Sequence, residues 1–215
     1  MPSNGFPKCV RVIDQLICQY VPHLRHYIIM LIVINVAGSL QTLESLKQLV
    51  IFHEYNTTFF ARNKTITIGS LGQDMKEDGV QNVTVKNATF IGTQNGLRIK
   101  TWARPSNGFV QGVQFIGAFM YYVENPIVID QSYCPHDLNC PGQVSGIQIS
   151  DVTFQDIRGV SIEPIAIKFD CSVKYPCKGI KLQNVNLKYL KQEAQSSCTN
   201  VMGEALGLVK PDGCL

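Results

Sequence analysis

A short motif that recurs four times in the second half of the chain restricts the fold more than any other feature. Its copies cover 85–90, 115–120, 149–154 and 182–187, so their starting positions are nearly evenly spaced. Apolar residues hold the first and sixth places of the motif, and Asn, Gly or Asp holds the third. Near-equal spacing of this kind is typical of a solenoid, in which each repeat adds one coil and stacks on its neighbours.

We interpret each copy as one rung of a right-handed parallel β-helix in an all-β chain. The apolar side chains would stack inward, and the third residue would form a tight turn, because Asn, Asp and Gly tolerate left-handed backbone geometry. An antiparallel β-sandwich also consists of short strands between turns and stays an alternative. A sandwich does not require coils of equal length, so the constant third place favours the β-helix.

The composition changes near residue 65, which divides the chain into an irregular segment, 1–64, and the coils of 65–215. The first segment contains an apolar run at 27–37 and one possible helix at 40–52. The run has the parts of a signal-peptide core, but the leader before it is unusually long. It is also short for a membrane span, so no stable span is predicted. A buried strand or helix, or translated sequence not native to the protein, are the other interpretations of the run.

Cysteines and glycosylation motifs indicate an oxidising compartment. Six of the eight cysteines lie beyond Tyr133 and form close pairs: Cys134 with Cys140, Cys171 with Cys177, and Cys198 with Cys214. Metal sites usually show two-residue gaps or matched histidines, so these spacings favour short disulfide-closed loops over a metal site. Cys9 and Cys18 have no obvious partners. Asn-X-Thr sequons begin at Asn56, Asn63, Asn82 and Asn87, which together with the cysteines predicts a secreted, disulfide-bonded glycoprotein.

The tripeptide Arg98-Ile99-Lys100 is the strongest candidate for a binding site. Alternation along a strand would place Arg98 and Lys100 on one face and Ile99 toward the core. An arginine grips a carboxylate with two parallel hydrogen bonds, while a lysine acts as a compact point charge. Two such cations on one face suit an anionic polysaccharide, although two solvated surface cations would look the same in sequence. The net charge of +3 is too small to indicate nucleic acid by itself.

This tripeptide lies within a series of ordered motifs that resembles the C-terminal part of the plant polygalacturonases of glycoside hydrolase family 28. The motifs are Ile68-Gly69-Ser70-Leu71-Gly72, Glu77-Asp78-Gly79-Val80, Gly92-Thr93, Asn95-Gly96-Leu97-Arg98-Ile99-Lys100-Thr101-Trp102, Val123-Glu124-Asn125-Pro126-Ile127, Ile129-Asp130-Gln131-Ser132-Tyr133-Cys134, Asp170-Cys171-Ser172 with Pro176-Cys177, and the closing Cys198 and Cys214-Leu215. The resemblance covers 66–215.

The resemblance implies a secreted, monomeric, cofactor-free β-helix of the plant cell wall, cut short at its N-terminal side, from an enzyme family that hydrolyses α-1,4-galacturonan in pectin. By the same resemblance, Arg98 and Lys100 would bind a substrate carboxylate beside the scissile bond. Tyr133 would pack or hydrogen-bond at the same subsite. Without the resemblance, Tyr133 would be interpreted as an ordinary half-buried strand tyrosine.

The sequence departs from the family at the residues that perform catalysis. Inverting glycosidases need two carboxyl groups roughly 6.5–9.5 Å apart, one as acid and one as base. The family takes them from an Asn-Thr-Asp motif and an Asp-Asp pair followed by Gly-His-Gly, and none of these three motifs occurs here. Lys64 stands in the place of the family histidine, and it does not titrate as a near-neutral imidazole does. We therefore assign no catalytic residue and expect no hydrolysis.

Other ionisable residues receive structural or surface roles. Asp74, Glu77 and Asp78 have the pattern of a solvated turn. Asp130, Asp151 and Asp156 stand at strand or turn positions, and His53 and His136 are isolated. Two alternatives to an enzyme remain open: a pectin-binding module without catalysis, and a truncated product without function.

Overall fold

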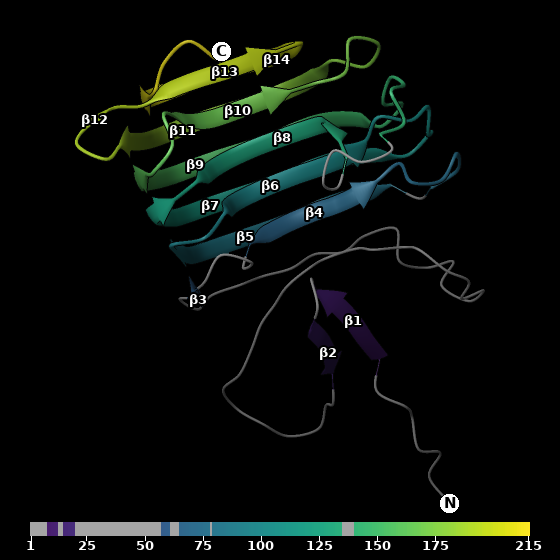
Figure 1. Cartoon of the computed structure of the whole chain (residues 1–215), viewed down its shortest axis with the longest axis horizontal. Coiled ribbons are helices and arrows are strands. Elements are labelled where there is room, and N and C mark those ends of the chain that lie inside the picture. Colours follow the sequence, from purple (N-terminus) through teal and green to yellow (C-terminus); the bar gives the residue numbers. More distant parts are fainter. Residues whose placement is uncertain (1–7, 13–14, 20–56, 61–64, 78, 135–139) are drawn as a thin grey trace, which may run out of the picture.

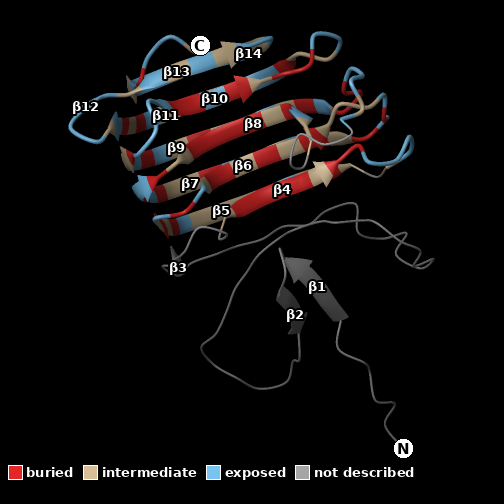
Figure 2. Ribbon diagram, viewed as in Figure 1, coloured by how far each residue is buried: buried red, intermediate tan, exposed pale blue. Residues whose placement is uncertain are grey.

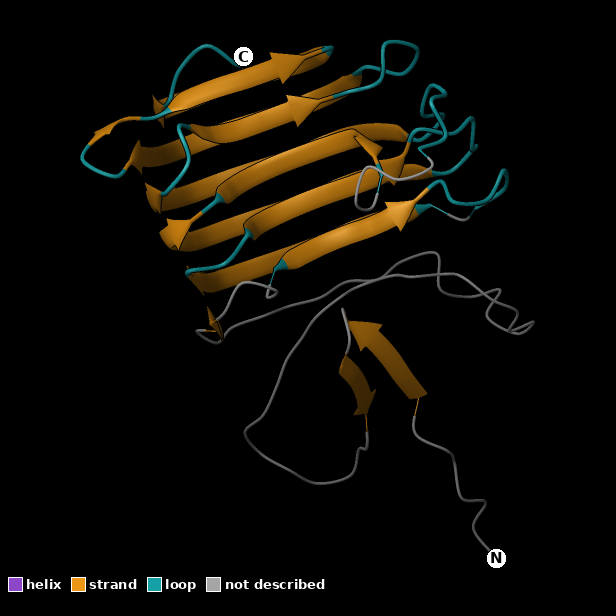
Figure 3. Cartoon of the chain, in the orientation of Figure 1, coloured by secondary structure: helices purple, strands orange, loops and turns teal. Residues whose placement is uncertain are grey.

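The computed structural model describes residues 8–12, 15–19, 57–60, 65–77, 79–134 and 140–215. The described residues contain strands and loops but no helix, as Figure 3 shows. Among them there is accordingly no helix long and apolar enough to cross a membrane. The apolar run at 27–37, the possible helix at 40–52, and the residues Lys64, Asp78, His53 and His136 lie outside the described residues.

Two strands near the N-terminus, β1 (Lys8–Val12) and β2 (Gln15–Gln19), pair with each other in an antiparallel hairpin. The backbone register places Cys9 directly opposite Cys18. Neither cysteine has an evident partner in the sequence, because the spacing between them does not by itself indicate a hairpin.

The strands of the rest of the described chain form two sheets that enclose one core, and in each sheet the strands stack one above another along the molecule (Figure 1). We call the first the short-strand sheet; its order is β13 (Gln195–Thr199), β10 (Ile165–Asp170), β8 (Asn125–Tyr133), β6 (Asn95–Trp102) and β4 (Ile66–Leu71). We call the second the long-strand sheet; it contains β3 (Thr57–Phe60), β5 (Val80–Ile91), β7 (Phe109–Val123), β9 (Gln148–Ser161), β11 (Cys177–Tyr189), β12 (Gln192–Glu193) and β14 (Val201–Lys210).

The chain alternates between the sheets, so that each long strand and the following short strand make one coil. Within the short-strand sheet every described pairing is parallel. In the described long-strand sheet only the two-residue β12 pairs antiparallel. This is the right-handed parallel β-helix that the repeat predicted, and it excludes the antiparallel sandwich.

The core consists of the inward side chains of both sheets, which stack coil upon coil. Phe154 stacks on Phe115 at a ring-centroid distance of 5.2 Å and on Phe169 at 5.7 Å. All three rings are buried, and Figure 2 shows buried residues along β4, β6, β8 and β10. Dense aromatic and β-branched stacking of this kind buries the apolar surface that drives the folding of these coils.

The repeat proves to contain two turn positions in each of β5, β7, β9 and β11 rather than one. Asn82, Asn87, Asp151, Asp156 and Asn184 all have positive φ, between 52° and 57°, and glycines of positive φ occupy matching places in neighbouring coils. One row of turns reads Asn82, Gly112, Asp151, Gly179, and the other reads Asn87, Gly117, Asp156, Asn184. Each row lets a long strand bend sharply while its apolar residues stay in register.

The second row corrects the predicted alignment of the copies. On one side Phe115 pairs with Val85, as predicted. On the other side it pairs with Phe154, whereas the predicted partner was Ile149. Leu182 pairs with Phe154 as well. The coil from Phe115 to Phe154 is therefore longer than its neighbours, and the predicted near-equal spacing was wrong there. The error arose because Ile149 begins the first of the two copies of the motif in β9, whereas Val85 and Phe115 begin the second copy in their strands.

Disulfide bonds close the three cysteine pairs that the spacing indicated: Cys134–Cys140, Cys171–Cys177 and Cys198–Cys214. The extra length of the longest coil lies in the connection between β8 and β9, which contains the first of these bonds. The chain thus adds residues at the end of the short-strand sheet and leaves the stacked rungs unchanged.

Candidate binding site on the short-strand sheet

The predicted alternation of β6 is confirmed. Leu97, Ile99 and Thr101 are buried, whereas Arg98 and Lys100 are only partly buried. Arg98 and Lys100 therefore lie on the outer face of the short-strand sheet, two residues apart along one strand. The fixed backbone of a central strand holds both cations in place, with neighbours on each side in β4 and β8.

Tyr133, at the end of β8, lies beside both cations. The Arg98 guanidinium carbon is 5.2 Å from the centre of the Tyr133 ring, and the Lys100 ammonium nitrogen is 4.4 Å from it. Trp102 contacts the same ring edge-to-face, at a centroid distance of 5.6 Å. The structure thus brings together the three residues proposed from sequence; their role in binding stays a prediction.

Asp130 is a member of this cluster to which the sequence assigned a structural role. Its carboxylate accepts a hydrogen bond of 2.7 Å from Arg98, and both side chains are largely buried, with relative exposures of 18% and 20%. Its backbone lies opposite Lys100 in the next coil. The signal that could have found it is the spacing of the repeat, since Asp130 follows Lys100 by one coil, just as Phe115 follows Val85.

Burial and charge lower the pKa of Lys100 from 10.5 to about 8. Burial is the largest cause because it disfavours the charged amine, and the positive charge of Arg98 adds to it. The negative charge of Asp130 acts in the opposite direction and raises this pKa. The site therefore contains two cations for one carboxylate, with one cation poised to titrate near pH 8.

Two buried donors in the cluster have no acceptor among the described residues. They are Nε of Arg98 and Nε1 of Trp102. Buried N–H groups are nearly always hydrogen-bonded, because leaving one unpaired costs about 1–3 kcal/mol. Both belong to residues that contact the Tyr133 ring, so the packing of this cluster leaves unpaired donors beneath its surface.

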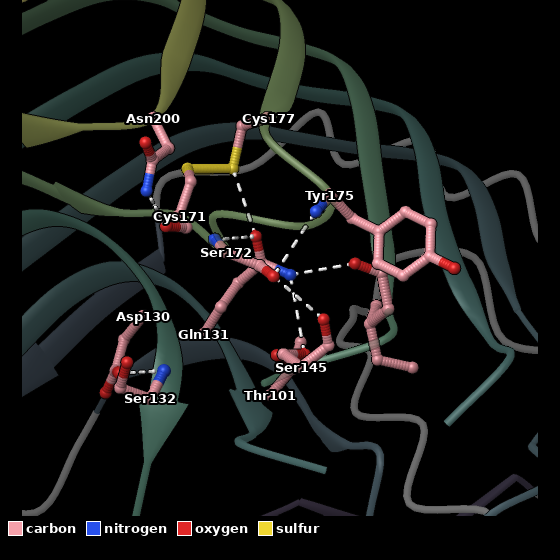
Figure 4. The surroundings of a disulfide bond; sticks show 11 residues. Thr101, Asp130, Gln131, Ser132, Ser145, Cys171, Ser172, Tyr175, Cys177 and Asn200 are labelled. Carbon is pink, nitrogen blue, oxygen red and sulfur yellow. Dashed lines mark hydrogen bonds between the residues drawn. A yellow bond between two sulfur atoms is a disulfide. The ribbon is translucent and has the colours of Figure 1, made fainter. Parts of the chain in front are cut away.

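A network of buried polar side chains fixes β8 beneath this cluster (Figure 4). The Gln131 amide nitrogen donates to the Ile147 carbonyl at 2.8 Å, and its oxygen accepts from the Ser172 backbone at 2.9 Å. Figure 4 shows Gln131 beside the Cys171–Cys177 disulfide. Because Gln131 is buried between Asp130 and Ser132 in the chain, its hydrogen bonds determine where the outward side chains of β8 lie.

The acidic cluster at 74–78 forms a turn, as far as the structure describes it. Both carboxylate oxygens of Glu77 accept backbone hydrogen bonds, from Gly72 at 2.8 Å and from Asp74 at 2.9 Å. Asp151 and Asp156, as expected, occupy turn positions of positive φ. In the described part of the chain no group of three His, Cys, Asp or Glu residues is arranged to hold a metal ion.

Comparison with known proteins supports the resemblance in the sequence. The family model described as Glycosyl hydrolases family 28 matches residues 55–207. A polygalacturonase of Prunus persica is 60% identical over 150 residues, which are 70% of this chain and 38% of that protein. A polygalacturonase of Malus domestica is 44% identical over 147 residues, or 68% of this chain and 31% of that protein. The chain thus spans about a third of the length of these relatives.

The fold has a counterpart among solved structures. An endo-xylogalacturonan hydrolase from Aspergillus tubingensis superposes with a TM-score of 0.56 over 66% of this chain and 41% of that one, at 21% identity. At that identity the likeness shows the β-helix alone. With the family match over most of its length, the chain belongs to the glycosyl hydrolases of family 28.

Proposed function

We propose that the outer face of the short-strand sheet binds the carboxylates of galacturonan, and that this chain does not hydrolyse it. The observation that supports binding is the cluster of Arg98, Lys100 and Tyr133, in which both cations lie against one aromatic ring and only Arg98 is paired with a carboxylate. Each galacturonate unit carries a carboxylate, so a bound chain would offer one anion for every sugar.

Arg98, Lys100 and Tyr133 have different contacts, and we assign each a different role in binding. Arg98 already donates from Nη2 to Asp130, and its buried Nε remains unpaired among the described residues. Lys100 has no ion pair there, so its ammonium group is the cation left for a ligand. Tyr133 presents a ring on which the apolar face of a pyranose packs well, since aromatic side chains combine a flat apolar surface with a polar edge.

The proposed loss of hydrolysis rests on the missing carboxyl pair. The chain contains neither an Asn-Thr-Asp motif nor an Asp-Asp pair. Asp130, the carboxylate within the cluster, is paired with Arg98 and so is a poor candidate for either acid or base. Binding of a substrate without groups that act in the transition state does not lower the barrier to its cleavage.

Two further proposals follow from the family. We treat 65–215 as the coils of a pectinase-like β-helix and 1–64 as a separate segment. We also propose that the protein acts as a secreted monomer at the plant cell wall, which the three disulfides support because such bonds persist in oxidising compartments.

The decisive experiment measures binding and turnover on the same preparations. We expect the chain to be retained on immobilised polygalacturonate at low salt and to release no reducing ends above a buffer blank. Arg98→Ala and Lys100→Ala should each abolish retention. The matched control is Lys168→Ala, because Lys168 is exposed on the same face but lies two coils from Arg98 in the strand register.

Each outcome bears on one part of the proposal. Release of reducing ends would overturn the proposed loss of hydrolysis. Equal loss of retention in all three variants would indicate general charge attraction rather than this site. Absence of a cooperative unfolding transition in the unmodified chain would favour a product without function.

A further inference from the structure

A cavity of about 600 Å³ lies on the outer surface of the long-strand sheet, on a different sheet from Arg98 and Lys100. Residues of β5, β7, β9 and β11 line it. One side is the second row of turns, Asn87, Gly117, Asp156 and Asn184; the other is the row two residues later, Thr89, Phe119, Arg158 and Asn186.

The cavity wall includes a complete glycosylation sequon. Asn87 and Thr89 both line the cavity, and they are the first and third residues of Asn87-Ala88-Thr89. Asn87 is exposed, and its side-chain amide has no hydrogen bond in the described part of the chain. The equivalent amide of Asn184 donates to Asp156 at 3.1 Å. An amide nitrogen without a partner is free to accept an oligosaccharide from a lipid pyrophosphate donor supplied by the secretory pathway. The nitrogen forms a bond to C1 of the first sugar and loses one proton, while the bond from C1 to the pyrophosphate breaks and the lipid pyrophosphate leaves.

The opposite wall has the chemistry of a neutral sugar site. Phe119 is 38% exposed and stacks with Tyr121 at a centroid distance of 6.4 Å, which makes a flat apolar platform. The Arg158 guanidinium lies 6.0 Å from the Phe119 ring. Aromatic faces accept the apolar face of a pyranose, and guanidinium groups donate to its oxygens. Asp156 and Arg158 balance each other in charge, which favours a neutral sugar over a uronate.

We propose that Asn87 carries an N-linked glycan whose first N-acetylglucosamine packs on Phe119 inside this cavity. The proposal goes beyond galacturonan binding and does not depend on it. Covalent attachment at the rim fixes the occupant, because the first sugar is held within reach of Phe119 whatever the rest of the glycan does.

A second sequon on the same strand provides an internal control. Asn82-Val83-Thr84 has the same backbone geometry, with φ of 57° at both Asn82 and Asn87. The register that places Phe119 and Arg158 beside Thr89 places Gln114 and Thr153 beside Thr84. The two sites differ in the aromatic ring of the neighbouring strand β7, and also in β3, which pairs with 88–91 but not with 82–84. The rates alone therefore do not isolate the ring, and substitutions in β7 are needed for that.

The test is the rate at which each glycan is removed from the folded protein. The full chain would be secreted from a eukaryotic host behind an added signal peptide and treated natively with peptide-N-glycosidase, which cuts between Asn and the first sugar. Site-resolved mass spectrometry then gives both rates in one molecule. We expect release from Asn87 to be at least about tenfold slower than release from Asn82.

Two substitutions test whether an aromatic ring beside the sequon causes the difference between the two release rates. Phe119→Gln should speed release from Asn87 toward the rate at Asn82, and Gln114→Phe should slow release from Asn82 toward the rate at Asn87. Both residues are exposed, so both variants should fold, which circular dichroism would verify. An unmodified Asn87, equal rates in the parent chain, or unchanged rates in Phe119→Gln would each overturn the proposal. Binding of trigalacturonate at Phe119 in unglycosylated protein would also overturn it, by assigning the cavity to free substrate.

Discussion

Raising the pH from 7 to 9 should weaken the binding of galacturonan through the loss of one proton from Lys100. The pKa of this residue is lowered to about 8 by burial and by Arg98. Below pH 8 Lys100 is mainly a cation that attracts a carboxylate, and above pH 8 it is mainly a neutral amine. The ligand carboxylates stay ionised throughout, since ordinary carboxyl groups titrate near pH 4.

The size of the effect follows from the titration. With a pKa of about 8, Lys100 is roughly nine-tenths charged at pH 7 and one-tenth charged at pH 9. If only the charged form binds the ligand, the association constant falls about tenfold, which is about 1.4 kcal/mol. A lysine with the ordinary value of 10.5 would give almost no change over this range.

The assay is calorimetric titration with trigalacturonate at pH 7, 8 and 9 and constant ionic strength, because salt also weakens the interaction. Lys100→Arg is the matched control: its guanidinium stays charged, so its affinity should be flat across the range. Near pH 8 the parent chain should also take up about half a proton on binding, seen as a dependence of the heat on the buffer. A flat profile in the parent chain, or an equal decline in Lys100→Arg, would refute the assigned role of Lys100.

Three further substitutions test other parts of the molecule. Asp130→Asn removes the negative charge that raises the pKa of Lys100, so this pKa should fall below 8 in an NMR titration; affinity at pH 6 should rise about two- to fivefold as Arg98 loses its competing partner. Gln131→Leu leaves two buried backbone groups without their 2.8 and 2.9 Å hydrogen bonds, so the free energy of unfolding in urea should fall by about 1–3 kcal/mol for each. Gly117→Ala should destabilise by about 1–2 kcal/mol, because φ is 69°; the new methyl group would also lie 2.9 Å from the Asn87 side-chain oxygen, but this exposed side chain can turn aside.

The control for the glycine substitution is Gly142→Ala. Gly142 has a similar φ of 60°, but a methyl group there meets nothing within 4 Å. It should therefore show the backbone cost alone. A loss for Gly117→Ala well above that for Gly142→Ala would contradict our reasoning, because it would show that Asn87 does not turn aside. For Gln131, a Leu variant as stable as the parent chain would contradict the predicted loss of stability.

The fold could be predicted from sequence because every coil of a solenoid repeats the same pattern of apolar residues and turn residues. The apolar first and sixth residues of the motif are expected to face inward, and this orientation can be predicted without knowledge of distant contacts. The exact register could not be predicted, because long strands carry two copies of the motif in succession. In β5, for example, Val80–Val85 and Val85–Phe90 both satisfy the pattern, so a sequence alignment can slip from one copy to the next without losing a match.

The candidate site could be predicted only in part. Alternation alone placed Arg98 and Lys100 on one face, and the family resemblance added Tyr133. The ion pair with Asp130 depends on the coil register, and the low pKa of Lys100 depends on burial by neighbours from other coils. The ion pair and the low pKa both depend on residues outside the tripeptide, so the local sequence pattern could not predict them.

The longest coil has a consequence for how such chains diversify. Its additional residues lie between β8 and β9, directly after Tyr133, and the Cys134–Cys140 bond closes part of them into a loop of its own. Such a loop can lengthen, shorten or change composition at small cost, because the rungs on either side of it stay paired. Related proteins could therefore change which parts of a polymeric ligand they prefer by changing this loop alone. The stacked residues of the core would stay the same.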